Sequence, residues 1–234
     1  MGTRKTPRVG NTTEEKVVFL TFDDGPSVNT VRILDTLMAY NQKGHNIKAT
    51  FFVNGNDTAF GKEIYNRIVD EGHAIGNHTY NHNYSINYTS LDSFIQNVES
   101  LEALIYDTTG VTMDIFRFPG GSNNTVHKRY GPQSIMLDTI EYIENRGYQY
   151  FDWSLDSRDA LAVTVSKEEI LSSVLNGIGN KRNVNILFHD SWPKTTTVEA
   201  LPEIIDYLIE KEYTFESLTK DSHYIHFEYI IDYP

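Results

Sequence analysis

The chain has 234 residues, of which 39% are hydrophobic and 22% are charged, and this composition is typical of a globular protein rather than a disordered one. A formal net charge of −12 argues against nucleic acid or an anionic membrane as the partner, because either would call for a basic surface. The absence of cysteine excludes disulfides, thiolate metal sites and cysteine nucleophiles, so any metal ligands must be His, Asp or Glu.

Short runs rich in β-branched and aromatic residues alternate with longer stretches of helical periodicity. The runs predict seven strands, at residues 16–22, 49–53, 74–77, 114–118, 148–152, 183–189 and 213–217. The periodic stretches predict helices at residues 30–40, 60–71, 91–106, 132–145, 167–175 and 198–211. Strands that alternate with helices form parallel sheets with right-handed crossovers. We therefore expect an α/β fold built as a closed or nearly closed β/α barrel, with an open doubly wound sheet as the alternative.

No linker rich in Pro, Gly or Ser divides the chain, and no repeat is visible. We expect a single domain at residues 16–234, preceded by a flexible leader at residues 1–15. No apolar run approaches the ~20 residues of a membrane span, and the first residues lack the apolar core of a secretory signal. If the protein is exported, we expect its signal or anchor to lie outside this sequence.

The first predicted strand runs directly into the acidic turn DDGPS, which begins with Asp23 and Asp24. In β/α barrels the functional side chains lie in loops that follow the carboxyl ends of strands. An acidic turn closed by Gly-Pro is common, because Asp and Gly accept turn geometry, and the motif alone favours a simple turn. Two adjacent carboxylates can also divide two tasks, one as a metal ligand and the other as a proton acceptor.

The motif HTYNH follows the third predicted strand and contains His78 and His82. Histidines spaced i, i+4 lie on one face of a helical turn, close enough to bind one ion. Taken alone, the motif favours two surface histidines in a loop. With Asp24 the set becomes two histidines and one carboxylate, which leaves coordination positions for water and substrate, as a catalytic metal requires. Zinc suits these ligands, and iron, cobalt and nickel remain alternatives.

The motif RFPGG follows the fourth predicted strand. A structural Arg beside a Pro-Gly turn is the simple interpretation. The functional interpretation is that Arg117 fixes a carboxylate through a bidentate ion pair. Gly120 would let a backbone N–H approach a ligand closely.

Two further polar groups end predicted strands: Asp152 and Trp153 at the fifth, and Leu187 with His189 at the sixth. A Trp is usually part of the core, and a single His is usually structural. However, five polar clusters fall at the carboxyl ends of five different strands. Their coincidence indicates a functional site at that edge of the sheet.

In chain order, TFDDGPS, HTYNH, RFPGG, DWS and LFH resemble the five motifs of the polysaccharide deacetylase family, carbohydrate esterase family four. The resemblance extends over about residues 16–217. It implies a distorted (β/α)7 barrel, in agreement with the predicted strands. It also implies a polysaccharide substrate and one divalent metal ion, with zinc first and cobalt, nickel or iron as alternatives.

The resemblance implies a role for each matching residue around the metal. Asp23 matches the general base of the family, and Arg117 matches the residue that pairs with this base. The residues that match the metal ligands are Asp24, His78 and His82.

On the opposite side of the site, the resemblance makes His189 the general acid and Asp152 the carboxylate that orients it. Trp153 and Leu187 match the walls of the acetyl pocket. The backbone N–H of Gly120 matches an oxyanion donor. Many members carry Tyr at this last position, so the substrate contacts beside Gly120 stay open.

These implications favour hydrolysis of N-acetyl groups from N-acetylglucosamine residues of a polysaccharide, with peptidoglycan as the first choice. Chitooligosaccharide deacetylation and O-acetyl-xylan esterase activity are the alternatives. A catalytically inactive carbohydrate-binding barrel is the alternative from another class, and it predicts the loss of a ligand or base, which this sequence retains. We expect a monomer in the cell envelope or outside the cell, with no nucleic-acid partner and no transmembrane segment in this chain.

Overall fold

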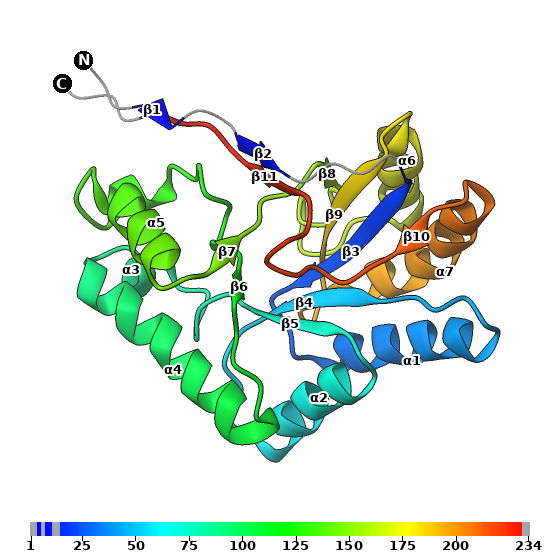
Figure 1. Cartoon of the computed structure of the whole chain (residues 1–234), viewed down its shortest axis with the longest axis horizontal. Helices are drawn as coiled ribbons and strands as arrows, with labels where there is room; N and C mark the ends of the chain where they lie inside the picture. Colours follow the sequence, from blue (N-terminus) through cyan, green and yellow to red (C-terminus); the bar gives the residue numbers. More distant parts are fainter. Residues whose placement is uncertain (1–3, 6–7, 11–14, 231–234) are drawn as a thin grey trace.

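The computed structural model of the chain describes residues 4–5, 8–10 and 15–230, and its centre is a curled parallel sheet (Figure 1). The strands of this sheet are β3 (Val17–Asp23), β4 (Ala49–Val53), β5 (Ala74–Asn77), β6 (Ile115–Phe116), β7 (Gln149–Tyr150), β8 (Leu155–Asp156), β9 (Asn183–His189) and β10 (Thr214–Phe215). Their order is β7-β6-β5-β4-β3-β9-β8, and β10 pairs with the beginning of β3.

Helices surround this sheet on its outer side (Figure 1). They are α1 (Val28–Gln42), α2 (Ala59–Asp70), α3 (Tyr84–Asn87), α4 (Leu91–Thr109), α5 (Ile135–Asn145), α6 (Lys167–Ile178) and α7 (Thr195–Glu210), with a 3-10 turn at Val126–Arg129. Serine side chains begin three of these helices, because their hydroxyl groups accept hydrogen bonds from otherwise unpaired backbone N–H groups. These caps are Ser27, Ser90 and Ser166.

The expected α/β barrel class is confirmed. All seven predicted strands are present, and the end strands β7 and β8 do not pair with each other, so the described sheet forms a half-barrel. One strand of this parallel sheet was missed: β8 has only two residues, which pair with β9 at Leu155↔Ile186 and Asp156↔Leu187. Three of the predicted strands are shorter than expected, with two residues each in β6, β7 and β10.

The centre of the sheet holds the carboxyl ends of its strands in fixed register. Every residue of β3 and β4 is buried, as expected for parallel strands covered on both faces. The ring of Phe22 stacks between Phe51, at 5.3 Å, and Phe188, at 5.4 Å between ring centroids. Because Asp23 pairs in register with His189, the ends of β3 and β9 lie at the same edge.

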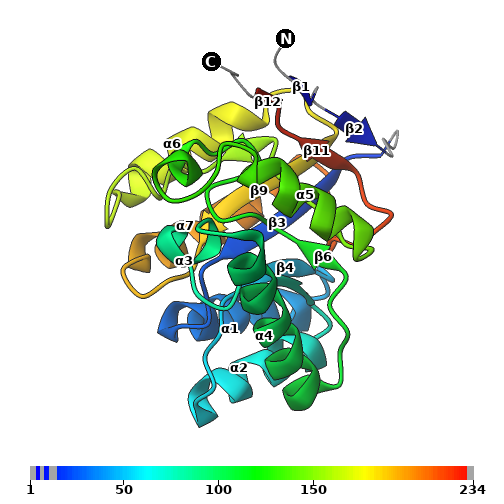
Figure 2. The ribbon, with the colours of Figure 1, turned by 90° about the vertical axis from the view of Figure 1, so that its left-hand side faces the viewer.

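Two short antiparallel ladders join the chain's two ends. β1 (Arg4–Lys5) pairs with β12 (Tyr229–Ile230), and β2 (Arg8–Gly10) pairs with β11 (Tyr224–His226). Figure 2 shows these pairs side by side above the sheet. The expected leader at residues 1–15 thus lies partly outside the described residues, and its described parts are these two strands.

Within residues 15–230, no helix is both long enough and apolar enough to cross a membrane.

Candidate active site

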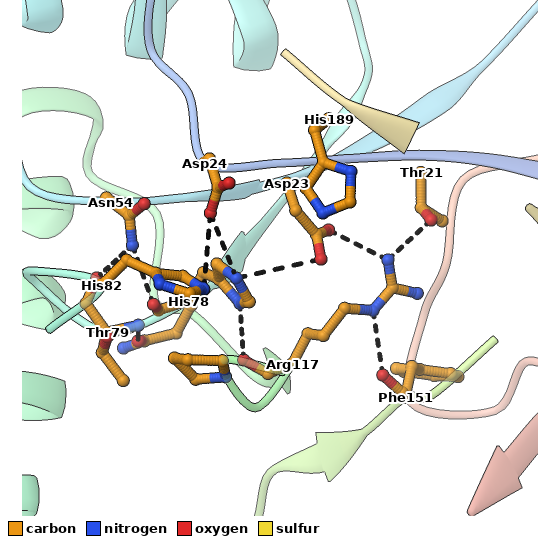
Figure 3. A network of polar contacts seen from close by, with 12 residues as sticks. Thr21, Asp23, Asp24, Asn54, His78, Thr79, His82, Arg117, Phe151 and His189 are labelled. Atoms are coloured by element: carbon orange, nitrogen blue, oxygen red, sulfur yellow. Dashed lines mark hydrogen bonds and ion pairs between the residues drawn. The ribbon is translucent and has the colours of Figure 1, made fainter. Parts of the chain in front are cut away.

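Residues from four of the five predicted polar clusters meet at the carboxyl edge of the sheet (Figure 3). Asp23 ends β3, and His189 ends β9 directly beside it. His78 follows β5 and Arg117 follows β6. The strand order therefore brings together residues that are far apart in the sequence.

Asp24, His78 and His82 form a convergent set of three metal-ligating side chains. One atom from each of them lies within 4.8 Å of the other two. The Asp24 Oδ1 atom is 3.5 Å from Nε2 of His78 and 3.7 Å from Nε2 of His82. This oxygen is buried and accepts no conventional hydrogen bond from the described residues. The donor set and its spacing fit a divalent cation bound by two imidazoles and one carboxylate.

The electrostatics of this set keep the Asp24 carboxylate ionised, which is the form that binds a cation. Burial alone would raise the pKa of Asp24, but the close imidazoles of His78 and His82 outweigh burial and hold this pKa well below its usual range. For His78, burial would lower the pKa, and the Asp23 and Asp24 carboxylates outweigh this and raise it. Protons therefore compete with a cation for the histidine rather than for the Asp24 carboxylate.

The segment that joins the two histidines is a loop. The helical turn expected from their spacing is therefore wrong. Thr79, between them, has a left-handed backbone with φ of +66°, which no helical turn contains. Their rings nevertheless lie 5.1 Å apart, so the expected proximity is confirmed. Nδ1 of His78 lies 2.7 Å from the Arg117 carbonyl, an acceptor that requires this nitrogen to carry the proton. The Nε2 atom of His78 is thus left free to face the metal position.

Arg117 is fully buried and contacts the expected partner, Asp23. The ion pair joins one nitrogen, Nη1, to Oδ1 of Asp23 at 3.0 Å, so the bidentate geometry expected from the sequence is wrong. The other donors are used elsewhere: Nη1 also reaches Thr21 Oγ1 at 2.7 Å, and Nε reaches the Phe151 carbonyl at 3.0 Å. The guanidinium also lies 4.2 Å from the centre of the Phe52 ring.

We expect Arg117→Ala to lower the free energy of unfolding by about 3–5 kcal/mol, because Asp23 would stay buried without its partner. Denaturant unfolding in the presence of a chelator measures this loss without a contribution from metal binding. Arg146→Ala is the matched control, since Arg146 pairs with Glu102 on the surface and its side chain is 42% exposed. That substitution should cost less than about 1 kcal/mol. Equal losses in the two variants would contradict the importance of the buried pair.

The partner of His189 is Asp159, and the expected partner, Asp152, was wrong. Asp159 is fully buried, and its carboxylate accepts hydrogen bonds from Nδ1 of His189 at 2.7 Å and from the backbone N–H of His189 at 2.8 Å. Thr197 donates a third bond to it at 2.9 Å. Burial alone would lower the pKa of His189, but the bond to Asp159 and its charge outweigh burial and raise this pKa to about 9. The imidazole is therefore a proton donor at neutral pH.

Asp152 instead joins the RFPGG loop to the C-terminal segment. It accepts hydrogen bonds from the backbone N–H of Ser122 at 2.8 Å and of Phe227 at 2.7 Å. The physical reason is the position of the two carboxylates relative to β8. Asp152 precedes β8, whereas Asp159 follows it, and β8 is the strand beside β9. The rule that site residues follow strand ends could have found Asp159, had β8 been recognised.

Trp153, Leu187 and Gly120 lie on the same edge. The Trp153 ring is half-buried and packs edge-on against Phe227, with 4.9 Å between centroids. Leu187 is buried in β9, two positions before His189. Gly120 is exposed with φ of +76°, and no described residue accepts a hydrogen bond from its N–H. These placements are compatible with acetyl-pocket walls and a free backbone donor.

Comparison with known proteins identifies the family. The polysaccharide deacetylase family model matches residues 10–133. The chain is 34% identical to the putative polysaccharide deacetylase YheN of Bacillus subtilis over 86% of this chain and 66% of that protein. It is 32% identical to a peptidoglycan-N-acetylglucosamine deacetylase of Bacillus cereus, over 92% of this chain and 73% of that protein.

Among solved structures, the chain is similar to the catalytic domain of a peptidoglycan N-acetylglucosamine deacetylase from Eubacterium rectale. The TM-score is 0.85 at 35% identity, with 93% of this chain and 94% of that one covered. The sequence matches and the shared fold together show that this chain belongs to the polysaccharide deacetylase family.

Proposed function

We propose that this protein is a metal-dependent hydrolase that removes N-acetyl groups from N-acetylglucosamine residues of a polysaccharide, with peptidoglycan favoured. The observation that carries the proposal is a pair of proton-transfer groups beside a metal-binding triad. Asp23 is held by Arg117 and stands outside the triad, while His189 is held by Asp159. A base and an acid in one site are what amide hydrolysis requires.

Asp24, His78 and His82 would hold one divalent cation, and zinc suits this combination of ligands. A cation bound there supplies Lewis acidity, which polarises a carbonyl group and lowers the pKa of water.

Asp23 is placed to take the proton from the attacking water. Its Oδ1 atom is occupied by Arg117 at 3.0 Å, and its Oδ2 atom lies 3.8 Å from Nε2 of His78, on the side of the triad. The carboxylate is thus fixed by one oxygen and directs the other toward the metal position. The free N–H of Gly120 would donate a hydrogen bond to the oxyanion that forms as water adds to the acetyl carbon.

His189 donates the proton that the departing amine needs. An amine leaves poorly unless it is protonated, so deacetylation requires this second group. Asp159 accepts the Nδ1 proton of His189, which leaves the Nε2 proton for transfer. The pKa of about 9 keeps the imidazole charged at neutral pH. Trp153 and Leu187 would enclose the acetyl methyl group.

The substrate choice is supported by the peptidoglycan N-acetylglucosamine deacetylases to which the chain is similar in sequence and fold. Such a substrate places the protein in the cell envelope or outside the cell, and we propose that it acts there as a monomer. The complete set of base, acid and triad residues argues against an inactive carbohydrate-binding barrel.

Acetate release from a panel of substrates tests this function. We expect release from peptidoglycan, a loss of at least about 100-fold on treatment with a chelator, and recovery on addition of zinc. Chitooligosaccharides and acetylated xylan are the comparison substrates, and a preference for either would select that alternative. If none of the three yields chelator-sensitive acetate, the proposed function is wrong.

A further inference from the structure

Both loops that carry the metal ligands contain a non-glycine residue in the left-handed region. Asp24 has φ of +78°, and Thr79, which follows His78, has φ of +66°. Each such residue costs of order 1–3 kcal/mol and persists only where its surroundings hold it in place. The surroundings of these two residues therefore help to set the geometry of the triad.

The end of β4 lies between the two loops and bonds to both. The Phe52 carbonyl accepts a hydrogen bond from the backbone N–H of Asp24 at 3.2 Å. The next carbonyl, that of Val53, accepts one from the backbone N–H of His78 at 3.1 Å. Two ligands of the triad are thus anchored to consecutive residues of one strand.

Asn54, the residue after β4, bonds to both loops by itself. Its backbone N–H donates to the Gly25 carbonyl at 2.7 Å, in the loop of Asp24. Its side-chain amide donates to the carbonyls of His78 at 2.8 Å and Thr79 at 2.9 Å (Figure 3). The Tyr65 hydroxyl donates to the Asn54 carbonyl and so fixes Asn54 against α2.

We propose that Asn54 is a positioning residue for the metal: its side chain holds the His78–Thr79 backbone in the left-handed loop that aims His78 at Asp24. This inference rests on the metal site of the proposed function. The two N–H donors of one amide meet two consecutive carbonyls, which a helical turn would have used for its own hydrogen bonds. Neither Asp nor Ala can make these contacts, since Asp lacks the donors and Ala lacks the polar group.

Asn87 provides an internal comparison, because its side chain supports the same loop through hydrogen bonds to Thr79 and Asn81. Its buried amide donates to Thr79 Oγ1 at 3.1 Å and to the Asn81 carbonyl at 2.9 Å. The Asn54 side chain bonds to the carbonyl of the ligand His78 itself, whereas these bonds of Asn87 reach Thr79 and Asn81. Substitution of Asn87 should therefore affect the stability of the loop more than the position of His78 relative to Asp24.

The test measures zinc affinity by competition with a chromophoric chelator, and the absorption spectrum of the cobalt(II) form. We expect Asn54→Ala and Asn54→Asp to weaken zinc binding by about 10- to 100-fold, and to change the cobalt spectrum because the ligands are displaced. Asn54→Ala adds no negative charge, so weaker zinc binding in this variant cannot come from a new charge near the ligands. Asn54→Gln, which keeps both donors, should bind zinc more tightly than Asn54→Asp. Asn176→Ala, which removes an exposed amide on α6, is the control and should match the wild type.

Thermal melting of each metal-free variant separates a general loss of stability from a change at the site. A wild type that binds neither zinc nor cobalt would contradict the metal site of the proposed function. A wild type that binds them, with Asn54→Ala and Asn54→Asp unchanged in affinity and cobalt spectrum, would overturn the role of Asn54. That role would also be wrong if Asn87→Ala changed the cobalt spectrum as much as Asn54→Ala does.

Discussion

Replacing Asp23 by asparagine should reduce kcat for acetate release by about 10²- to 10⁴-fold while leaving zinc binding intact. Asparagine has the shape of aspartate but cannot accept the proton from water. Asp23 is not one of the three convergent ligands, so its substitution removes no ligand atom. The charge of Asp23 helps to raise the pKa of His78, so the loss of this charge should lower that pKa and make the imidazole easier to metallate.

The measurement pairs steady-state acetate release with zinc titration by calorimetry. Asp24→Asn is the matched control one residue away, because it replaces a ligand of the triad. This control should lose zinc affinity as well as activity. If Asp23→Asn also lost zinc, or if it retained near-normal turnover, Asp23 would not be the base.

The carboxyl-edge residues could be predicted from the sequence because the central strands carry a strong local signal. β3 and β4 are buried along their whole length, which produces continuous apolar runs bounded by turn residues. The carboxyl end of each run could therefore be located, and the parallel arrangement brings the polar residues at or just after these ends to one edge. Asp23, His78, Arg117 and His189 were found in this way.

The remaining parts depend on tertiary contacts that leave no local pattern. β8 has two residues and exists through its pairing with β9, so no alternation of polar and apolar residues marks it. The family resemblance of the DWS motif assigned to Asp152 the role that Asp159 holds in the structure, and without β8 no strand end pointed to Asp159. Spacing alone also suggested a helical turn for the two histidines, whereas Thr79 has a left-handed conformation and is contacted by the side chains of Asn54 and Asn87, which lie outside this motif.

The position of Asp159 predicts a change in the pH dependence of the enzyme. Burial lowers the pKa of His189, but Asp159, with smaller contributions from the charges of Asp24 and Asp23, raises it to about 9 from the ordinary value of 6.5. A general acid must be protonated, so wild-type activity should fall as the pH rises through about 9. In Asp159→Asn the burial remains and the charge of Asp159 is gone, so the pKa of His189 should fall. The alkaline limb of the kcat profile should move to lower pH accordingly.

The same shift predicts a change in stability. Because the folded-state pKa of His189 is raised, its contribution is complete below the unfolded value of 6.5 and is lost as the pH rises to about 9. Denaturation midpoints of the wild type should fall over this interval, and those of Asp159→Asn should fall less.

Asp152→Asn distinguishes the two carboxylates, since both are fully buried but only Asp159 contacts His189. Asp152 bonds to the backbone of Ser122 and Phe227, so its substitution should destabilise the fold while leaving the alkaline limb in place. If the alkaline limb of the kcat profile shifted in Asp152→Asn and stayed unchanged in Asp159→Asn, Asp152 would be the carboxylate that orients His189. The expected result is the reverse, because a carboxylate can stabilise the charge of His189 only from the position that Asp159 occupies beside Nδ1.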